Sequence, residues 1–285
     1  MERLRPTGSL PLMATVVFVH AHPDDEAIAT AGTMAGLAEA GHRVVLLTAT
    51  GGELGEVPDG LLAEGETLAE RRAVELAEAA RMLGVARVES LGYLDSGMEG
   101  EPTNRAPGCF AMADVEEAAA KLAAILVEES AEAVVAYDEH GGYGHPDHVQ
   151  VHRVGVRAGQ LAGTPRVFMA TQDRDYFRSL LDDGSDSAWA PSEEMAEGME
   201  TMGEPGTRIS TEVDVTAWLG AKRAAMRAHA SQIADDSFFL AMPDDVFERV
   251  WSKEWYIQVT PPVPDPFDGP RRPGLLDGRA GVGAG

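Results

Sequence analysis

Strand-like and helix-like segments alternate along the first half of the chain. Continuous apolar runs rich in β-branched residues, at 14–19, 43–50 and 133–137, are typical of strands buried on both faces of a parallel sheet. Segments with helical spacing, at 27–40 and 67–83, follow the first two of these strands and end next to a glycine. Strands that alternate with helices of ten or more residues predict parallel βαβ units with right-handed crossovers. We therefore predict an α/β fold, with a Rossmann-like, mainly parallel sheet flanked by helices.

The pattern becomes less regular toward the C-terminus. We predict further strands at 88–91, 166–171 and 209–215, and further helices at 114–129 and 216–231. An aromatic-rich stretch follows the last of these helices. The second half is therefore expected to form an elaborated C-terminal part of the same fold.

Two segments depart from the strand and helix pattern. Residues 172–207 are acidic and rich in Gly, Ser and Met, which predicts a long insertion or lid. Residues 261–285 are dominated by Pro, Gly and charge, which predicts a flexible tail. We therefore expect one domain, residues 1–260, followed by that tail.

The composition excludes several classes of protein. With 23 basic and 47 acidic residues the formal charge is −24, which argues against binding to nucleic acid or to a membrane surface and favours small neutral or cationic substrates. The single Cys109 cannot form an intramolecular disulfide, so the cytoplasm is the expected compartment. The apolar run near the N-terminus is too short for a signal peptide or a membrane span. A homo-oligomer is compatible with the sequence, which leaves the oligomeric state open.

Polar side chains follow the first predicted strand directly, in the motif His22-Pro-Asp-Asp-Glu26. Ligands of parallel sheets collect at the carboxyl ends of the strands, and an imidazole with two adjacent carboxylates offers ligands to a divalent ion. Because successive carboxylates in a turn point in different directions, one can bind metal while the other faces the substrate. The simpler alternative is that Asp24 and Asp25 only cap the following helix.

A second polar motif, Gly141-Gly-Tyr-Gly-His145-Pro-Asp-His148, follows a different strand and weighs against that alternative. Its two histidines lie three residues apart at the start of a helix and so share roughly one face. Together the motifs predict a mononuclear metal site formed by His22, Asp25 and His148, with a coordination position left for water. Two imidazoles and one carboxylate suit Zn²⁺ and also Fe²⁺, so the metal is left open.

The other polar residues of the two motifs are candidates for catalysis. Asp24 is placed by adjacency to accept a proton from the attacking water, and His145 is the candidate donor to the developing oxyanion. Asp147 lies between the two histidines, where its carboxylate is expected to bond His145 and set the tautomer or charge of that ring. Its alternative role is to cap the helix, and both roles stay open.

The two motifs, in this order and after apolar strands, resemble the LmbE-like (PIG-L) family of metal-dependent N-deacetylases. The resemblance spans roughly residues 16–156, with weaker echoes in Asp95-Ser-Gly-Met98 and Ala228-His-Ala-Ser-Gln232. It implies an LmbE-like fold, and the same metal ligands, base and neighbouring histidine that the residues themselves indicate. The region 172–207 matches nothing in the family's pattern and is expected to shape the choice of substrate.

The resemblance also implies residues that contact the substrate or the oxyanion. They are Tyr143, Arg72, Asp95, Glu56 and His229. Tyr143 matches a residue for oxyanion stabilisation or substrate contact, Arg72 one for sugar recognition, and Asp95 and Glu56 match the pocket rim. For Arg72 the alternative is a solvated helix charge paired with the glutamate three residues later. For His229 the alternative is an ordinary surface position.

These observations predict a hydrolase that removes the N-acetyl group from an amino sugar or a related small amide. An N-acetylglucosaminyl-inositol and a secondary-metabolite glycoside are both compatible substrates. The first alternative is a mycothiol S-conjugate amidase, which cuts a larger amide. A further alternative is a non-catalytic metal- or nucleotide-binding α/β protein. Nucleotide binding is disfavoured because carboxylates, rather than Gly-x-Gly-x-x-Gly, follow the first strand.

Overall fold

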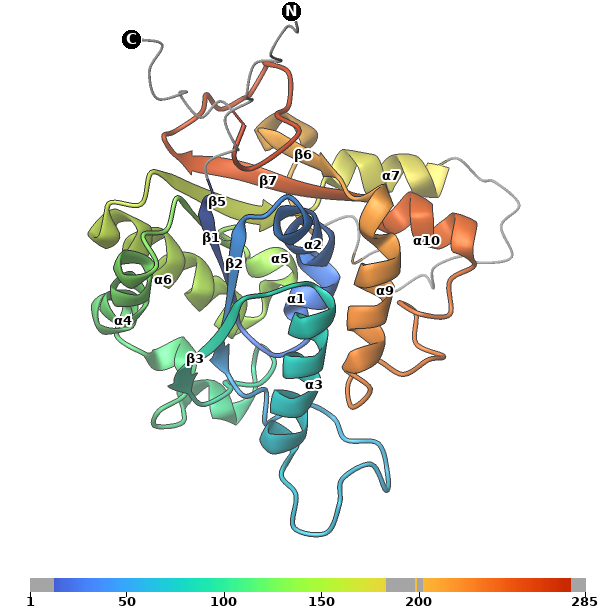
Figure 1. The fold of residues 1–285 in the computed structure, drawn as a ribbon. Helices are drawn as coiled ribbons and strands as arrows, with labels where there is room; N and C mark the ends of the chain where they lie inside the picture. Colours follow the sequence, from blue (N-terminus) through green and yellow to red (C-terminus); the bar gives the residue numbers. More distant parts are fainter. Residues whose placement is uncertain (1–12, 183–197, 199–201, 278–285) are drawn as a thin grey trace, which may run out of the picture.

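One mixed sheet runs through the part of the chain that the computed structural model describes, residues 13–182, 198 and 202–277, with helices on both faces (Figure 1). Five parallel strands are followed at one edge by two antiparallel strands. Across the sheet the order is β3 (Arg87–Tyr93), β2 (Arg43–Thr50), β1 (Thr15–His20), β4 (Ala133–Tyr137), β5 (Arg166–Thr171), β7 (Lys253–Thr260) and β6 (Thr211–Asp214). The predicted α/β, mainly parallel architecture is confirmed.

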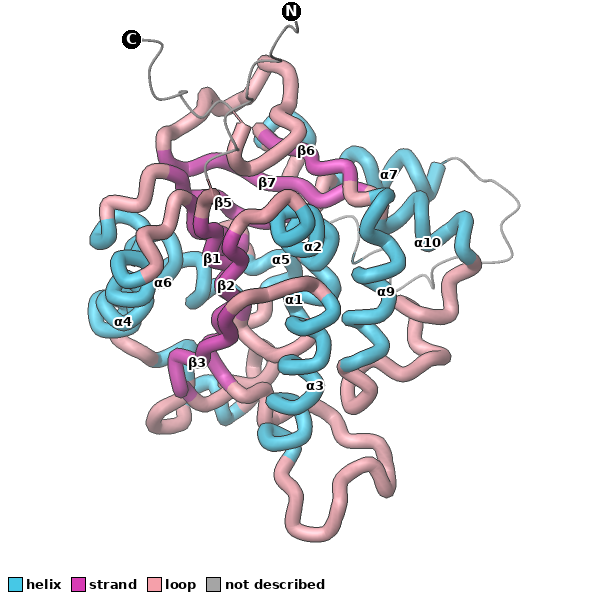
Figure 2. Tube along the Cα trace, viewed as in Figure 1, coloured by secondary structure: helices cyan, strands magenta, loops and turns pink. Residues whose placement is uncertain are grey.

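The helices form two layers (Figure 2). One face of the sheet is covered by α1 (Asp25–Ala29), α2 (Ala31–Glu39), α3 (Leu68–Met82) and α9 (Leu219–Ala228), and the other by α4 (Val115–Glu128) and α6 (Pro146–Ala162). The short α5 (Gly141–Gly144) precedes α6, and α7 (Arg174–Asp182) and α10 (Asp244–Trp251) lie beside the antiparallel edge. Within the described residues, no helix has the length and apolarity to span a lipid bilayer.

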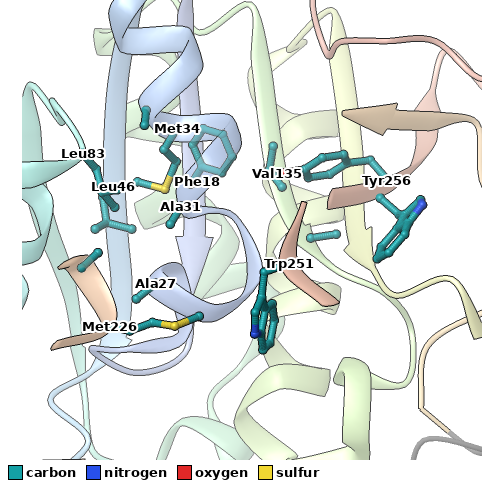
Figure 3. Close-up of a cluster of buried hydrophobic side chains, with 14 of the residues drawn as sticks. Phe18, Ala27, Ala31, Met34, Leu46, Leu83, Val135, Met226, Trp251 and Tyr256 are labelled. Atoms are coloured by element: carbon teal, nitrogen blue, oxygen red, sulfur yellow. The ribbon is translucent and has the colours of Figure 1, made fainter. Parts of the chain in front are cut away.

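The pleat of β1 divides the core between the two faces of the sheet. Phe18 packs with Met34 and Leu83 under one helix layer, as Figure 3 shows. Val17 and Val19 belong instead to the cluster beneath α4 and α6. Because successive side chains of a strand point to opposite faces, a strand covered on both faces is apolar at every position. This explains the unbroken apolar run at 14–19 in the sequence.

Most predicted elements begin and end within one or two residues of the predicted limits. The strands at 43–50, 133–137 and 166–171 begin and end at the predicted residues. The predicted helix at 27–40 is instead divided into α1 and α2 at Thr30, whose φ of −139° is not helical. The hydroxyl of Thr30 lies 2.9 Å from Nε2 of buried His20. The break therefore coincides with a buried polar contact between the helix layer and β1.

The C-terminal part differs from the prediction in where the tail begins. The aromatic-rich stretch forms α10 and β7, and β7 lies between β5 and β6. Residues 261–277 pack against this edge: Leu275 is only 2% exposed, and Arg271 pairs with Asp173 and Glu212 at 2.6 Å each. Ion pairs with acidic residues from distant parts of the chain therefore fix this segment, although its composition is typical of a flexible tail. Residues 278–285 lie outside the described residues.

The predicted acidic insertion, residues 172–207, is described in part. α7 takes up 174–182, and the hydroxyl of Tyr176 donates a 2.6 Å hydrogen bond to the carbonyl of Arg249 on α10. Residues 183–197 and 199–201 lie outside the described residues, so the lid stays a prediction.

The strand order reverses between β1 and β4, because β2 and β3 lie on one side of β1 and β4 and β5 on the other. In open α/β sheets, ligands bind outside the carboxyl ends of the strands at such a switch point. The His22–Glu26 motif leaves the end of β1, and the Gly141–His148 motif follows the end of β4. The topology therefore brings the two predicted motifs to the same crevice.

Glu129 joins three elements at the opposite end of the sheet. It is the C-cap of α4, and its carboxylate lies 2.6 Å from Arg43 of β2 and 2.8 Å from Arg87 of β3. Hydrogen bonds from the two guanidinium groups lower the pKa of Glu129 to about 2. A carboxylate with a lowered folded-state pKa stabilises the fold above its unfolded pKa, and that stabilisation is lost as the pH falls through the folded value.

Replacing Glu129 by Gln is therefore expected to lower the thermal unfolding midpoint at pH 7 by about 2–4 °C. The difference from the wild type should shrink as the pH falls from 4.5, the ordinary pKa, toward about 2. Glu128→Gln is the matched comparison and should have a smaller effect, because that carboxylate is 62% exposed and pairs, among the described residues, only with Arg87, at 3.0 Å. A Glu129→Gln difference that stays constant down to pH 2.5 would contradict this account.

Candidate metal centre and active site

The ligand residues leave two neighbouring strands of the sheet. His22 lies in the turn between β1 and α1, Asp25 is the first residue of α1, and His148 lies in the first turn of α6. His145 is the N-cap of α6 and Pro146 follows it at the first helical position, which suits proline because no main-chain N–H is required there. The rings of His22, His145 and His148 approach one another with centroids 4.6–5.4 Å apart. The structure thus brings together the residues predicted to hold a metal.

The Asp25 carboxylate lies between the two predicted histidine ligands. Its Oδ2 is 3.5 Å from His22 Nδ1, and its Oδ1 is 3.3 Å from His148 Nε2. The main-chain N–H of His22 also donates to Asp25 Oδ2 at 2.7 Å, which orients the carboxylate. His148 Nε2 is buried and makes no hydrogen bond to any described residue. A buried orphan nitrogen beside a carboxylate and a second imidazole fits a divalent ion bound among the three.

Negative charge surrounds the other ring nitrogen of His22. Nε2 lies 3.2 Å from Asp147 Oδ2 and 3.5 Å from Asp95 Oδ1. Burial lowers the pKa of His22, but hydrogen bonds to Asp147, Asp25 and Asp95 raise it well above its ordinary value. The pocket therefore favours positive charge, as a cation site requires.

The predicted contact of Asp147 with His145 is wrong. The Asp147 carboxylate pairs with His22 Nε2 and accepts a 2.9 Å hydrogen bond from the main-chain N–H of Ser96, whose hydroxyl also donates to it. Its main-chain N–H donates instead to His145 Nδ1 at 3.1 Å, so the histidine caps the helix. Because α6 turns the Asp147 side chain toward the β1 turn, this carboxylate orients a ligand histidine.

Asp95 is not at the rim of the pocket, where it was predicted. It is 7% exposed, and its carboxylate accepts hydrogen bonds from the main-chain N–H groups of Leu54 and Gly97 at 3.2 and 2.9 Å. Although burial raises the pKa of Asp95, the hydrogen bond with His22 lowers it below its usual range. Asp95 therefore contributes negative charge beside the ligand histidine.

Asp24 adopts a strained backbone conformation. Its φ of 122° lies in a region that favours glycine. The main-chain N–H donates to Glu26 Oε2 at 3.0 Å, and the carboxylate lies 3.1 Å from Arg72. Burial raises the pKa of Asp24 to about 7, against the opposing charge of Arg72. The turn thus directs Asp24 and Asp25 to different partners, as the sequence predicts.

Arg72 is buried, and its alternative as a solvated helix charge is wrong. It is 3% exposed, and it donates to the carbonyls of Gly52 and Pro23 at 2.7 and 2.5 Å as well as contacting Asp24. Glu75, its expected partner, is buried elsewhere and accepts hydrogen bonds from Ser231. Arg72 therefore holds the predicted base in place, and a contact with sugar stays a prediction.

His229 is also buried, so its alternative as a surface residue is wrong. It is 0% exposed, and its Nε2 lies 2.6 Å from Glu26 Oε1. Burial lowers the pKa of His229, but the charge and hydrogen bond of Glu26 raise it above its ordinary value. Since Glu26 also accepts from the N–H of Asp24, His229 supports the turn from α9. A contact of His229 with substrate stays a prediction.

His145 and Tyr143 face the ligand histidines. Because His145 Nδ1 accepts the N–H of Asp147, a neutral ring carries its proton on Nε2 and can donate from there. Burial, followed by the charges of His22 and His148, lowers the pKa of His145 to about 4. The ring of Tyr143 is 54% exposed and lies 5.0 Å from the ring of His148. Both side chains are therefore placed to contact a ligand at the metal site.

Glu56 lies on an exposed loop beside the site. Its main-chain carbonyl accepts a 2.9 Å hydrogen bond from Gln232 Nε2, and Gln232 Oε1 lies 3.4 Å from Arg72. The loop is thereby tied to the segment after α9. The predicted role of the Glu56 side chain in substrate binding stays a prediction.

The roles of three residues at the site were not predicted from the sequence. Glu26 bonds the Asp24 turn, Ser96 holds Asp147, and the ring of Tyr137 stacks on His148 with centroids 4.4 Å apart and planes 5° apart. Tyr137 ends the strand before the second motif, and Ser96 follows Asp95 in the weaker motif. Their position within a motif, for Glu26 and Ser96, or just before one, for Tyr137, was therefore the only available signal.

Among the described residues, two groups of potential ligands contain His22, and a third, formed by Glu139, His140 and Glu204, does not. Arg208 already occupies it, since its Nη1 lies 2.7 Å from Glu139 and 2.8 Å from Glu204. A guanidinium between two carboxylates supplies the positive charge that a metal would bring. The cluster of His22, Asp25 and His148 is therefore the better candidate for a metal centre.

The comparisons with known proteins agree with this geometry. The model of the PIG-L family, described as GlcNAc-PI de-N-acetylase, matches residues 17–159. The chain therefore belongs to the PIG-L family, which confirms the resemblance predicted from the two motifs. A relative from Thermomonospora curvata, 1D-myo-inositol 2-acetamido-2-deoxy-α-D-glucopyranoside deacetylase, is 40% identical over 286 residues, covering 93% of this chain and 94% of its own length.

More distant solved structures share the fold. N,N′-diacetylchitobiose deacetylase from Pyrococcus horikoshii is 22% identical, with a TM-score of 0.53 over 86% of this chain and 83% of its own. The 4-carboxy-2-hydroxymuconate hydratase from Pseudomonas putida is 20% identical, with a TM-score of 0.55 over 88% and 98%. Because a hydratase has the same fold, the fold does not by itself specify deacetylation, and the function depends on the residues of the site.

The backbone strain at Asp24 can be measured separately from the chemical role of its carboxylate. Asp24→Gly and Asp24→Ala both remove the carboxylate that faces Arg72, but only glycine adopts a φ of 122° without a Cβ penalty. We expect the glycine variant to be more stable than the alanine variant by about 1 kcal/mol in urea unfolding. An alanine variant of equal or greater stability would show that the turn is unstrained at this residue.

The carboxylate behind His22 is expected to set metal affinity. Asp147→Asn should weaken the affinity of the metal-free protein for Zn²⁺ about 10- to 100-fold, because the amide orients the ring less strongly and adds no negative charge. Competition with a chromophoric chelator measures this change. Glu117→Gln is the control, since that carboxylate is 69% exposed on α4. Unchanged affinity in Asp147→Asn would contradict the assignment.

Proposed function

We propose that this chain is a zinc-dependent hydrolase that removes the acetyl group from the nitrogen of an N-acetylglucosaminyl-inositol. Two observations together support this proposal: the geometry of the site and the similarity to a known deacetylase. The predicted ligands His22, Asp25 and His148 meet beside Asp24, in a chain that is 40% identical over 93% of its length to a deacetylase of that substrate. Zinc is favoured because two imidazoles and one carboxylate are typical of catalytic zinc sites, although Fe²⁺ accepts the same ligands.

The residues of the site have separate tasks in this reaction. His22, Asp25 and His148 would hold a divalent ion, which would supply Lewis acidity toward the acetyl carbonyl and a water molecule. Asp24, held by Arg72, takes a proton from the attacking water and returns it to the departing nitrogen. His145 donates from Nε2 to the oxygen on which negative charge develops, and the exposed Tyr143 approaches the same region. Acetate and a primary amine result.

Two substitutions separate the base from the ligands. Asp24→Asn is expected to lower kcat about 10²- to 10⁴-fold while the protein keeps one metal ion per chain, because the amide accepts no proton. His148→Ala is expected to lower metal content itself. Kinetics and elemental analysis of the same preparations measure both effects. Equal loss of turnover and metal in Asp24→Asn, or full metal content in His148→Ala, would contradict these roles.

The substrate is tested by a direct comparison. The purified protein, supplied with Zn²⁺ or Fe²⁺, is incubated with N-acetylglucosaminyl-inositol and, separately, with a mycothiol S-conjugate, and the released primary amine is measured. We expect the first substrate to have the higher kcat/KM. Preference for the conjugate would make the protein an amidase. If neither compound is hydrolysed with either metal, the proposed function is wrong.

A further inference from the structure

A cavity of about 460 Å³ opens from the metal centre toward the antiparallel edge of the sheet. At one end it is lined by Asp24, Asp25, Tyr143 and His148. The remaining wall is mainly apolar. Its principal side chains are Phe177, Phe238, Phe239, Val250, Trp251 and Trp255. We call this space the aromatic cavity.

The charged groups in the wall of the aromatic cavity are paired with other parts of the protein. Lys222 is fully buried, and its Nζ lies 2.7 Å from Glu254 and 2.7 Å from the carbonyl of Ile28. Lys253 Nζ lies 3.0 Å from Glu212. The cavity therefore offers a ligand mainly apolar contact along its aromatic wall.

The cavity is much larger than the acetyl group requires. A water molecule takes up about 30 Å³ in the liquid, and a methyl group is of the same order. The methyl of an acetyl group would thus leave most of the 460 Å³ unfilled. Several further methylene groups, each gaining about 0.8 kcal/mol on leaving water, would fit the apolar wall.

The two sides of the reaction centre differ in polarity. Arg72, which the family resemblance assigns to sugar recognition, and Glu56, which it assigns to the pocket rim, are absent from the lining of the aromatic cavity. The substituents of a trans amide extend in opposite directions from the reacting carbon and nitrogen. A polar sugar on the nitrogen therefore directs the acyl group toward the aromatic wall.

We propose that the aromatic cavity is an acyl-chain subsite, which admits N-acyl groups longer than acetyl. This inference rests on the proposed function for its reaction, since the same amide bond is cut and a fatty acid replaces acetate as a product. Trp251 and Phe239 are its specificity-determining residues. The preferred substrate class is a glucosamine whose nitrogen bears a straight acyl chain of about six carbons.

The test is a chain-length profile with the metal-loaded protein. kcat/KM is measured for methyl glucosaminides with N-acetyl, N-butyryl and N-hexanoyl groups, and in a second arm for N-acetylglucosamine with methyl, butyl and hexyl groups on the anomeric oxygen. We expect kcat/KM to rise up to about fourfold per added methylene in the acyl arm, and to change little in the second arm. A rise confined to the second arm, or no rise in either, would overturn the acyl assignment.

Substitutions in the cavity wall test whether the dependence of kcat/KM on acyl-chain length arises in the aromatic cavity. Ala29 lines the cavity, so Ala29→Leu should lower the hexanoyl-to-acetyl ratio of kcat/KM about tenfold, whereas Ala40→Leu on the exposed end of α2 should not. Phe239→Ala should lower the same ratio severalfold, with the half-buried Phe267→Ala as its matched control. The ratio within one preparation is independent of the fraction of folded, metal-loaded protein. Unchanged ratios in both cavity variants would overturn the proposal.

A binding measurement separates this inference from the proposed function. Calorimetry with the metal-free protein compares methyl glucosaminides that carry N-hexanoyl and N-acetyl groups. Tighter binding of the hexanoyl compound, weakened in Ala29→Leu, supports the subsite even if no amine is released, in which case only the proposed reaction fails. Equal binding of the two compounds, with acetyl substrate still cleaved, would leave the proposed function standing and overturn the subsite.

Discussion

The strained turn at Asp24 is the constraint on which the rest of the site depends. Two adjacent carboxylates must face different partners, and a φ of 122° at the first of them achieves this within one residue. Such a conformation costs on the order of 1–3 kcal/mol and persists only where its surroundings determine it. Here Glu26 accepts the N–H of Asp24, Arg72 faces its carboxylate, and the N–H of His22 holds Asp25.

The supports of this turn come from helices that are distant in the sequence. Arg72 belongs to α3, and His229 follows α9 and pairs with Glu26. Lys222 of α9 binds the carbonyl of Ile28 in α1 and Glu254 of β7, and that glutamate accepts two main-chain N–H groups at the start of α2. Buried charges of this kind are favourable only when they are paired and hydrogen-bonded, so they link the C-terminal elements to the β1 turn in one arrangement.

The sequence was sufficient for the strands, for most helices and for the clustering of the predicted ligands, because each depends on local pattern. An apolar run covered on both faces is recognisable, and motifs after β1 and β4 meet wherever the strand order reverses between them. The partner of Asp147 was not predictable in this way. A carboxylate between two histidines can turn toward either side, and the choice of His22 depends on Ser96 and on the rotation of α6. The burial of His229 likewise depends on Glu26, 203 residues away in the chain.

In the proposed reaction, the catalytic groups and the wall proposed to set selectivity come from different parts of this chain. The family model covers residues 17–159, which contain the three ligands and Asp24, whereas the aromatic wall of the cavity is built by residues between Phe177 and Trp255. The same fold serves a hydratase, so the common framework leaves the reaction to the residues at the strand ends. Glu254 and Trp255 are adjacent on β7 and both line the cavity, and Glu254 also accepts the main-chain N–H groups of Gly32 and Thr33 at the start of α2. Changes in the wall would therefore act on a strand that is hydrogen-bonded to the helix layer beside the β1 turn.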